Sequence, residues 1–343
     1  MSWLRALALV ALGLAALVWL IPAAPMTGDG QHYIEFVRNG LQHGASSWHE
    51  RRLLGPLIVR AMPIDAQPGF LVLTLASLAA TAVLMWQSTG SLLAIPLLFA
   101  TWVAAPNVRE YGLVDPLAWA FVAGVWLATV RKQWLLAGAI AAIGVVAKEV
   151  VVLAAIAAAA AAWQPRRPYV ALGVAAPAVL IVGLLTVLFP GSGGDARAYV
   201  MKWIQDGLGS LGPARVVFLL FASYGALWLL VPRGFMMLPA HLKRAGLVYL
   251  VAAIILPLVG SPERMEEAIF PLFVTSAVLA TKDDVKVGWI LAIGNMLFVA
   301  RIGGSADIPT LLAWAGLLVA CLLAALTYVA PKLVLRTVAS LLR

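Results

Sequence analysis

Apolar runs long enough to cross a membrane recur along the whole chain. A transmembrane helix needs about 20 predominantly apolar residues, and alanine-rich runs such as VVLAAIAAAAAAW favour helix over strand. We therefore predict an all-α polytopic transmembrane helix bundle of about twelve spans. The predicted spans are residues 3–24, 68–86, 90–105, 113–130, 134–148, 150–163, 168–189, 215–232, 243–260, 267–281, 286–301 and 309–329.

The composition excludes an ordinary soluble protein. Hydrophobic residues make up 63% of the 343 positions, charged residues only 11%, and the mean hydropathy is +0.97. Soluble domains carry about 25% charged residues. We expect residues 1–343 to form a single transmembrane domain with no soluble domain attached. The one cysteine, Cys321, allows no intrachain disulfide and lies in an apolar span.

The distribution of charge predicts how the bundle is oriented. If the N-terminus is cytoplasmic, the inside segments hold thirteen of the 24 basic residues but only two of the 15 acids, Asp283 and Asp284. This positive-inside pattern accounts for the net charge of +9 without any nucleic-acid partner. The first run, with Arg5 and the following IPAAP, also resembles a signal peptide, but its core exceeds the usual length of about 7–15 residues, so we expect it to be retained.

The segments that face the outside are longer and richer in polar side chains than those inside. Functional residues usually concentrate on the connecting segments at one face of a scaffold. We therefore expect the functional face to be extracytoplasmic. Its segments are residues 25–67, 106–112, 148–149, 190–214, 261–267 and 302–308.

The first outside loop, 25–67, is predicted to contain two juxtamembrane helices. Residues 31–42 are amphipathic, and Gly40 or Gly44 would close this helix. The second helix falls within WHERRLLGPLIVRAMP, which has basic ends, and Pro63 stops it. Both segments suit helices that lie in the membrane interface.

Four short motifs on the outside face resemble those of the GT-C superfamily of multispanning glycosyltransferases. GDGQHY directly follows the first span, and VREYGLVDPLAWAFVAGVWLA resembles the second external loop entering the fourth span. AKEVVVL is similar to the Lys-Glu pair that follows the fifth span, and SPERMEEAIFPLFV is similar to a late external loop. One departure is that Asp29 is flanked by glycines, whereas several branches have two adjacent acids there.

The resemblance implies transfer of a sugar from a polyprenyl-phosphate donor to a lipid, glycan or protein acceptor, on the extracytoplasmic face of a bacterial cytoplasmic membrane. It makes Asp29 the general base that takes the proton of the acceptor hydroxyl. Basic side chains would hold the departing phosphate, which arginine suits because its planar fork binds phosphate oxygens bidentately. These are Lys148, Arg264 and one of Arg51 or Arg52. The substrate pocket would include Tyr33, Glu50, Arg109, Glu110, Asp115, Glu149, Glu263 and Arg301.

Each candidate also has a purely structural interpretation. Asp29 can be the N-cap of the helix it precedes, and Arg51 and Arg52 can anchor the loop to lipid headgroups. Lys148 and Glu149 interrupt an apolar segment that runs from 134 to 163, where an unpaired charge costs several kcal/mol. They either form a simple turn at the outer surface or line a cavity, and we favour the cavity. Arg301 can extend to the interface.

A metal site and other classes of function are weaker alternatives. His32, His43 and His49 lie in the first loop with Asp29 and Glu50, but no compact metal-binding spacing is present, so no cofactor is expected. A secondary transporter or lipid flippase would also place ionisable residues within the membrane. No second copy of the long loop is evident, which argues against repeated halves. A third alternative is a non-catalytic assembly protein of the cell envelope.

Overall fold

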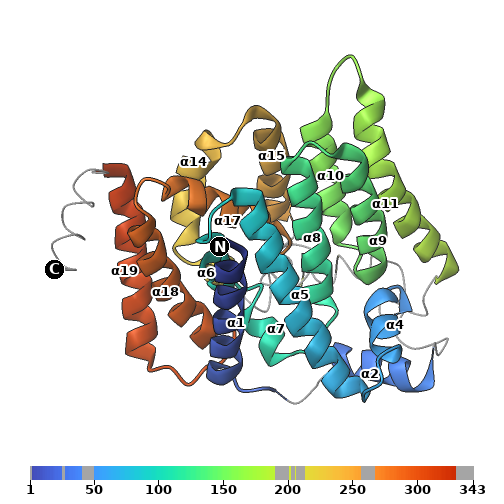
Figure 1. Ribbon diagram of the computed structural model, residues 1–343, viewed down its shortest axis with the longest axis horizontal. Coiled ribbons are helices and arrows are strands. Elements are labelled where there is room, and N and C mark those ends of the chain that lie inside the picture. The colour runs from blue at the N-terminus through green and yellow to red at the C-terminus, as the bar shows by residue number, and fades with distance from the viewer. Residues whose placement is uncertain are drawn as a thin grey trace.

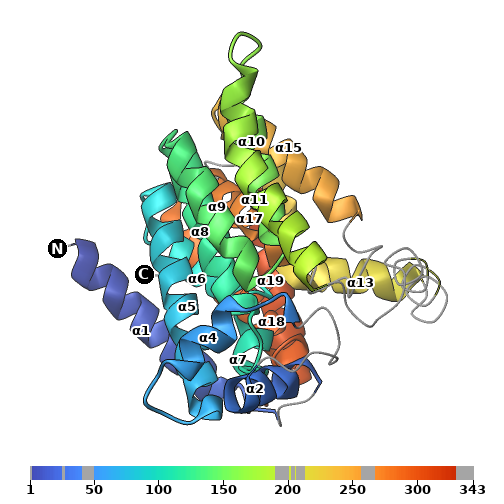
Figure 2. The ribbon, with the colours of Figure 1, turned by 90° about the vertical axis from the view of Figure 1, so that its right-hand side faces the viewer.

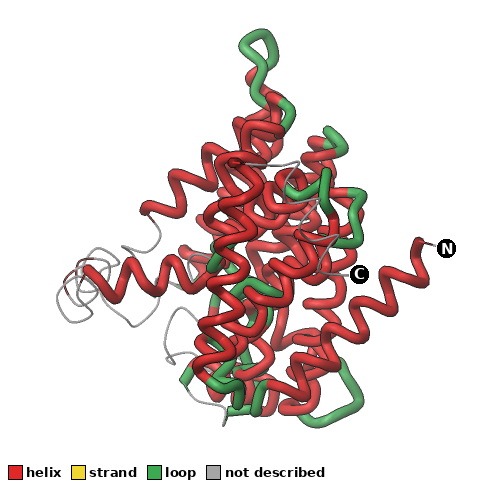
Figure 3. The backbone as a smooth tube through the Cα atoms, turned by 90° about the vertical axis from the view of Figure 1, so that its left-hand side faces the viewer, coloured by secondary structure: helices red, strands yellow, loops and turns green. Residues whose placement is uncertain are grey.

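The computed structural model describes residues 2–24, 28–40, 50–189, 201, 205, 213–255 and 267–329. The described part is helical and contains no strand (Figure 3). The all-α bundle that the sequence predicts is confirmed. Most of the predicted loop 190–214 and most of the late external loop 261–267 lie outside the described residues.

Five helices of the described residues are long and apolar enough to cross a membrane, and a bent pair makes a sixth candidate span. Four shorter apolar segments accompany them. The chain is therefore a helical membrane protein by length and composition. The five long helices are α1 (Ser2–Leu20), α5 (Ala66–Thr89), α11 (Pro168–Leu188), α18 (Val285–Ile302) and α19 (Thr310–Val329).

Five other predicted spans correspond to shorter helices, which have 11 to 16 residues each. They are α8 (Asp115–Val130), α9 (Trp134–Ala147), α10 (Val151–Ala162), α15 (Ala240–Ile255), and the short 3₁₀ turn η2 (Glu267–Ile269) that leads into α17 (Phe270–Ala280). The most extensive packing is between α18 and α19, α14 (Leu227–Met237) and α17, α5 and α8, and α9 and α11. Glycine permits one of these close approaches, because a Cβ at Gly294 would lie 2.4 Å from the carbonyl oxygen of Gly316.

Two predicted spans are not continuous helices. Residues 90–105 form α6 (Ala94–Phe99) and, after a turn, α7 (Ala105–Arg109). Residues 215–232 fall in α13 (Pro213–Tyr224) and α14 (Leu227–Met237), which meet at 63°; α13 lies across the direction of the bundle helices (Figure 2). The prediction of unbroken spans was wrong here. Pro106 contributes to the first break, because proline cannot donate the hydrogen bond that a continuous helix requires.

The two breaks face each other across a single buried side chain. Asn295 Nδ2 donates to the carbonyl of Ala100 (2.6 Å) and of Tyr224 (3.0 Å), and Asn295 Oδ1 accepts from the N–H of Ala226 (2.8 Å). The N–H of Trp102 also donates to the carbonyl of Ser223 (2.8 Å). Backbone groups released by both breaks therefore find partners inside the protein, as an apolar surrounding requires.

The two interfacial helices of the first loop are also confirmed as helices. α2 (Asp29–Asn39) ends at Gly40, whose φ of 80° is left-handed, and α4 (Leu54–Arg60) follows the part of the loop that is not described. Both lie at one end of the bundle, opposite the connection between α10 and α11 (Figure 1). Tyr33, Val59, Phe70 and Val114 form a small core that joins this loop to α5 and α8.

Candidate functional site

Arg52 joins the first loop to the bundle. Its Nε donates to Glu149 Oε2 (3.1 Å) and its Nη2 to Glu149 Oε1 (2.6 Å), which is a bidentate ion pair between residues 97 positions apart. Its Nη1 donates to the Tyr33 hydroxyl (3.2 Å). Of the two arginines that the sequence offered, Arg52 is thus the one held in the interior of this site. Arg51 donates instead to the carbonyl of Phe189 (3.0 Å).

The charge on Glu149 is stabilised by this pairing. Burial on its own raises the pKa of this carboxyl, but Arg52 and then Lys148 outweigh that effect, and its pKa lies below the usual range. A carboxyl whose pKa is lowered on folding contributes its stability at a pH above the pKa of the unfolded chain. The contribution is lost as the pH falls through the lower, folded value.

Replacing Arg52 with lysine is expected to keep the charge but lose the two-pronged contact. Because Glu149 is partly exposed, the loss of unfolding free energy should be modest, about 1–2 kcal/mol. Unfolding of the purified protein in detergent, followed by circular dichroism, measures it. Arg60→Lys, on the exposed end of α4, is the matched control. Equal stabilities of the two variants would contradict a structural role for the bidentate contact between Arg52 and Glu149.

Lys148 forms a second ion pair, with Asp115. Both side chains are buried, with 3% and 1% of their surface exposed. Asp115 is the first residue of α8, where a negative charge is favoured by the helix dipole. Lys148 has extended backbone between α9 and α10, and successive side chains of extended backbone point in opposite directions. The adjacent residues Lys148 and Glu149 can therefore reach separate partners. The buried position of Lys148 is not that of a simple surface turn.

A further set of buried side chains lies next to Lys148, and the sequence analysis did not predict its contacts. The Lys148 ammonium lies 5.3 Å from the centroid of the Trp119 ring, within the range of a cation–π interaction. Trp119 Nε1 donates to Glu267 Oε2 (2.6 Å), and Asn107 Nδ2 donates to the same oxygen (3.0 Å). Glu267 is 2% exposed. The sequence feature that indicates such a contact is Trp119 within an apolar helix, because a buried indole N–H requires a polar partner.

Asp29 and Tyr33 lie one helical turn apart on α2, so their side chains share a face. Burial raises the pKa of the Tyr33 hydroxyl well above its ordinary value; Arg52 opposes this shift, whereas Asp115 and Asp29 add to it. Both carboxylates are therefore within electrostatic reach of this hydroxyl. Gly28, not Asp29, occupies the N-cap position of α2. The N-cap interpretation of Asp29 is wrong in this structure.

Two of the other predicted site residues, Arg109 and Arg301, bond to groups outside this network. Arg109 Nη1 donates to Ser305 Oγ (2.5 Å), and its carbonyl accepts from Ala24. Arg301 donates to the nearby carbonyl of Ala306 (3.3 Å). Glu110 is exposed after α7, and Glu50 is buried. Glu263 and Arg264 lie outside the described residues.

Among the described residues, no group of three or more His, Cys, Asp and Glu side chains is arranged to hold a metal ion. His43 and His49 are not described. Comparison of the chain with protein-family models, curated proteins and solved structures gave no match. The candidate site therefore rests on the contacts of its own residues.

Proposed function

We propose that this chain is a membrane glycosyltransferase with a GT-C-like architecture of about twelve spans. It would move a sugar from a polyprenyl-phosphate donor to a lipid, glycan or protein acceptor. The reaction would take place on the extracytoplasmic face of a bacterial cytoplasmic membrane. The observation that carries the proposal is that two cations from distant segments, Arg52 and Lys148, meet at the end of the bundle where α2 presents Asp29 and Tyr33.

The chemistry assigns a separate task to each group. Asp29 accepts the proton of the acceptor hydroxyl while that oxygen attacks the anomeric carbon of the sugar. The bond between this carbon and the phosphate oxygen breaks, and polyprenyl phosphate leaves with the electron pair. Arg52 and Lys148 stabilise the charge that develops on the leaving phosphate.

Both cations are already neutralised by carboxylates, which supports a site that exchanges one anion for another. Glu149 and Asp115 keep Arg52 and Lys148 charged and in place before the donor arrives. An incoming phosphate then competes with the carboxylates for the same N–H donors. Arg264, if it joins them, would come from the late external loop.

Asp29→Asn tests the proposal directly. Turnover with a panel of polyprenyl-phosphate sugars is expected to fall by about 10²–10⁴-fold, because the amide cannot accept the proton. Glu35→Gln is the matched control, since Glu35 is on the same helix and its side chain is 62% exposed; its turnover should equal that of the wild type. Unchanged turnover in correctly folded Asp29→Asn protein would overturn the role of Asp29.

A secondary transporter is the second candidate, and the broken helices favour it. Discontinuous helices often form transporter sites near the middle of the membrane. Here the polar groups at the α6–α7 and α13–α14 breaks bond to one another and to Asn295, which assigns them a structural task. Uptake of radiolabelled substrate by reconstituted vesicles, without chemical change, would support the transporter instead.

A further inference from the structure

An apolar groove with an arginine at its edge lies between α10, α11 and α15. Its volume is about 520 Å³, and its lining includes Ile156, Ala160, Trp163, Leu172, Arg244 and Leu247. Trp163, Leu172 and Leu247 are about half exposed or more. In a membrane protein such side chains face lipid, so the groove is open to the acyl chains of the bilayer.

Arg244 is fixed at this position by the end of α10. Its Nη2 donates to the carbonyl of Ala161 (3.0 Å), and its Nη1 donates to the carbonyl of Trp163. Carbonyls of the last helical turn lack partners within the helix and attract a cation. These two bonds use two of the five N–H donors of a guanidinium group. The orientation of Arg244 is thus set in advance, with donors left for an anion.

Two further cations follow Trp163, a residue that lines the groove, in the chain. Arg166 and Arg167 are exposed in the connection between α10 and α11, which is the end of the bundle opposite α2 and α4 (Figure 1). No acidic residue lies in this connection. Basic clusters between transmembrane helices at the cytoplasmic side favour anionic headgroups.

We infer that this groove binds an anionic glycerophospholipid of the cytoplasmic leaflet. One acyl chain lies along Leu172 and Leu247, and the phosphate contacts Arg244 with Arg166 and Arg167. Charge complementarity at the arginines selects an anionic lipid over a zwitterionic one, and the exposed apolar side chains contact its acyl chain. This site is independent of the proposed reaction, because it lies at the other end of the bundle.

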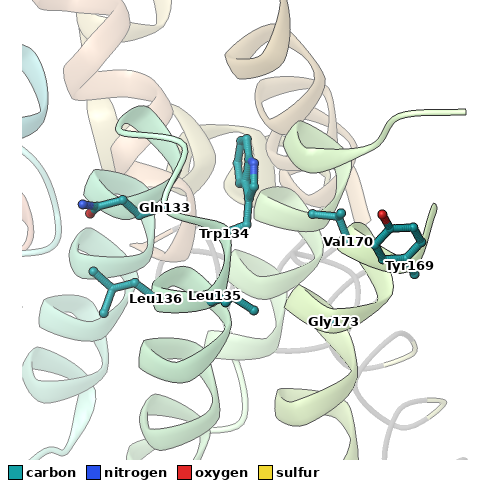
Figure 4. A pocket seen from close by; sticks show the side chains of 7 residues that line it. All are labelled: Gln133, Trp134, Leu135, Leu136, Tyr169, Val170 and Gly173. Carbon is teal, nitrogen blue, oxygen red and sulfur yellow. The ribbon is translucent and has the colours of Figure 1, made fainter. Parts of the chain in front are cut away.

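A second groove of the same volume provides an internal control. It lies between α9 and α11, and Gln133, Trp134, Tyr169 and Gly173 help to line it (Figure 4). No charged side chain lines it. A Cβ added at Gly173 would meet no atom within 4 Å, so a side chain at this position begins in open space.

Thermal unfolding of the detergent-solubilised full chain tests the inference, with dioleoyl-phosphatidylglycerol or dioleoyl-phosphatidylcholine titrated in. Phosphatidylglycerol should raise the Tm of the wild type and saturate, as expected for a ligand of the folded state; phosphatidylcholine should raise it much less. Ala175 also lines the groove, and Ala175→Leu, which places a larger side chain in it, should reduce the phosphatidylglycerol shift to about half or less. Gly173→Leu, in the second groove, should retain the full shift.

Arg244→Gln provides a second variant that does not depend on filling the groove. It should lose the preference for phosphatidylglycerol while keeping its Tm in phosphatidylcholine, since glutamine can still donate to the Trp163 carbonyl. Equal shifts with the two lipids, or an unchanged preference in both Ala175→Leu and Arg244→Gln, would overturn the site. A full shift with glycerol 3-phosphate alone would also overturn it, by showing that a free phosphate suffices without the acyl chain.

Discussion

Lys148→Met is expected to destabilise the protein by about 3–5 kcal/mol, because it leaves a buried carboxylate without its cation. Asp115 is 1% exposed and its ion-pair partner would be removed, while the methionine still fills the space beside Trp119. The free energy of unfolding in mixed detergent micelles measures the loss.

The double variant Lys148→Met/Asp115→Leu separates the ion pair from the packing around it. Replacing both partners of a buried pair with apolar residues is often neutral or stabilising, so most of the stability should return. Sugar transfer should not return, since the proposed phosphate contact stays absent. If the single and double variants unfold with the same free energy, the pair does not carry the stability assigned to it.

Asn295→Leu is expected to cost about 3 kcal/mol or more, because three backbone groups lose their partner inside an apolar region. These are the carbonyls of Ala100 and Tyr224 and the N–H of Ala226. Leucine has the same branched shape as asparagine but two bulkier methyl groups, so overpacking adds to the loss of the hydrogen bonds. Unfolding monitored by tryptophan fluorescence and circular dichroism provides the measurement.

Asn39→Leu is the matched control, because Asn39 is exposed at the end of α2 and the same change there should lie within about 0.5 kcal/mol of the wild type. Gly225 lies directly against the Asn295 side chain. Its φ is 52°, and a Cβ there would lie 2.1 Å from Asn295 Oδ1. Stability of Asn295→Leu equal to that of Asn39→Leu would show that the two helix breaks are held by other contacts.

The sequence predicted the elements whose cause is local. Apolar runs separated by charged connections correspond to α5, α8, α9, α10 and α11 with small differences at the ends. The amphipathic pattern after Asp29 correctly predicted α2, which ends at Gly40, one of the two glycines that could have closed it. In each case the side chains that decide the outcome lie within the element or directly beside it.

The broken helices could not be predicted from local sequence. Residues 90–105 are as apolar as a true span, yet α6 ends at Phe99, and the carbonyl of Ala100 bonds to a residue 195 positions away. Hydropathy does not distinguish a continuous helix from a broken one when distant side chains satisfy the released backbone groups. Only the position of Asn295 in the folded chain decides this.

The candidate site was also predicted only in part. Lys148 and Glu149 could be singled out in the sequence, because charge is costly in an apolar surrounding and therefore rare there. Arg52 was one of two adjacent arginines that the family resemblance suggested. Their partners could not be assigned, since Glu149 pairs with a residue 97 positions away and Trp119 with Glu267, 148 positions away. The sequence by itself determined a helical membrane protein with its polar residues concentrated on one face, because hydrophobicity and charge act residue by residue. Which charges neutralise one another was decided only by the tertiary structure, because pairing depends on distances that the packing of the helices sets.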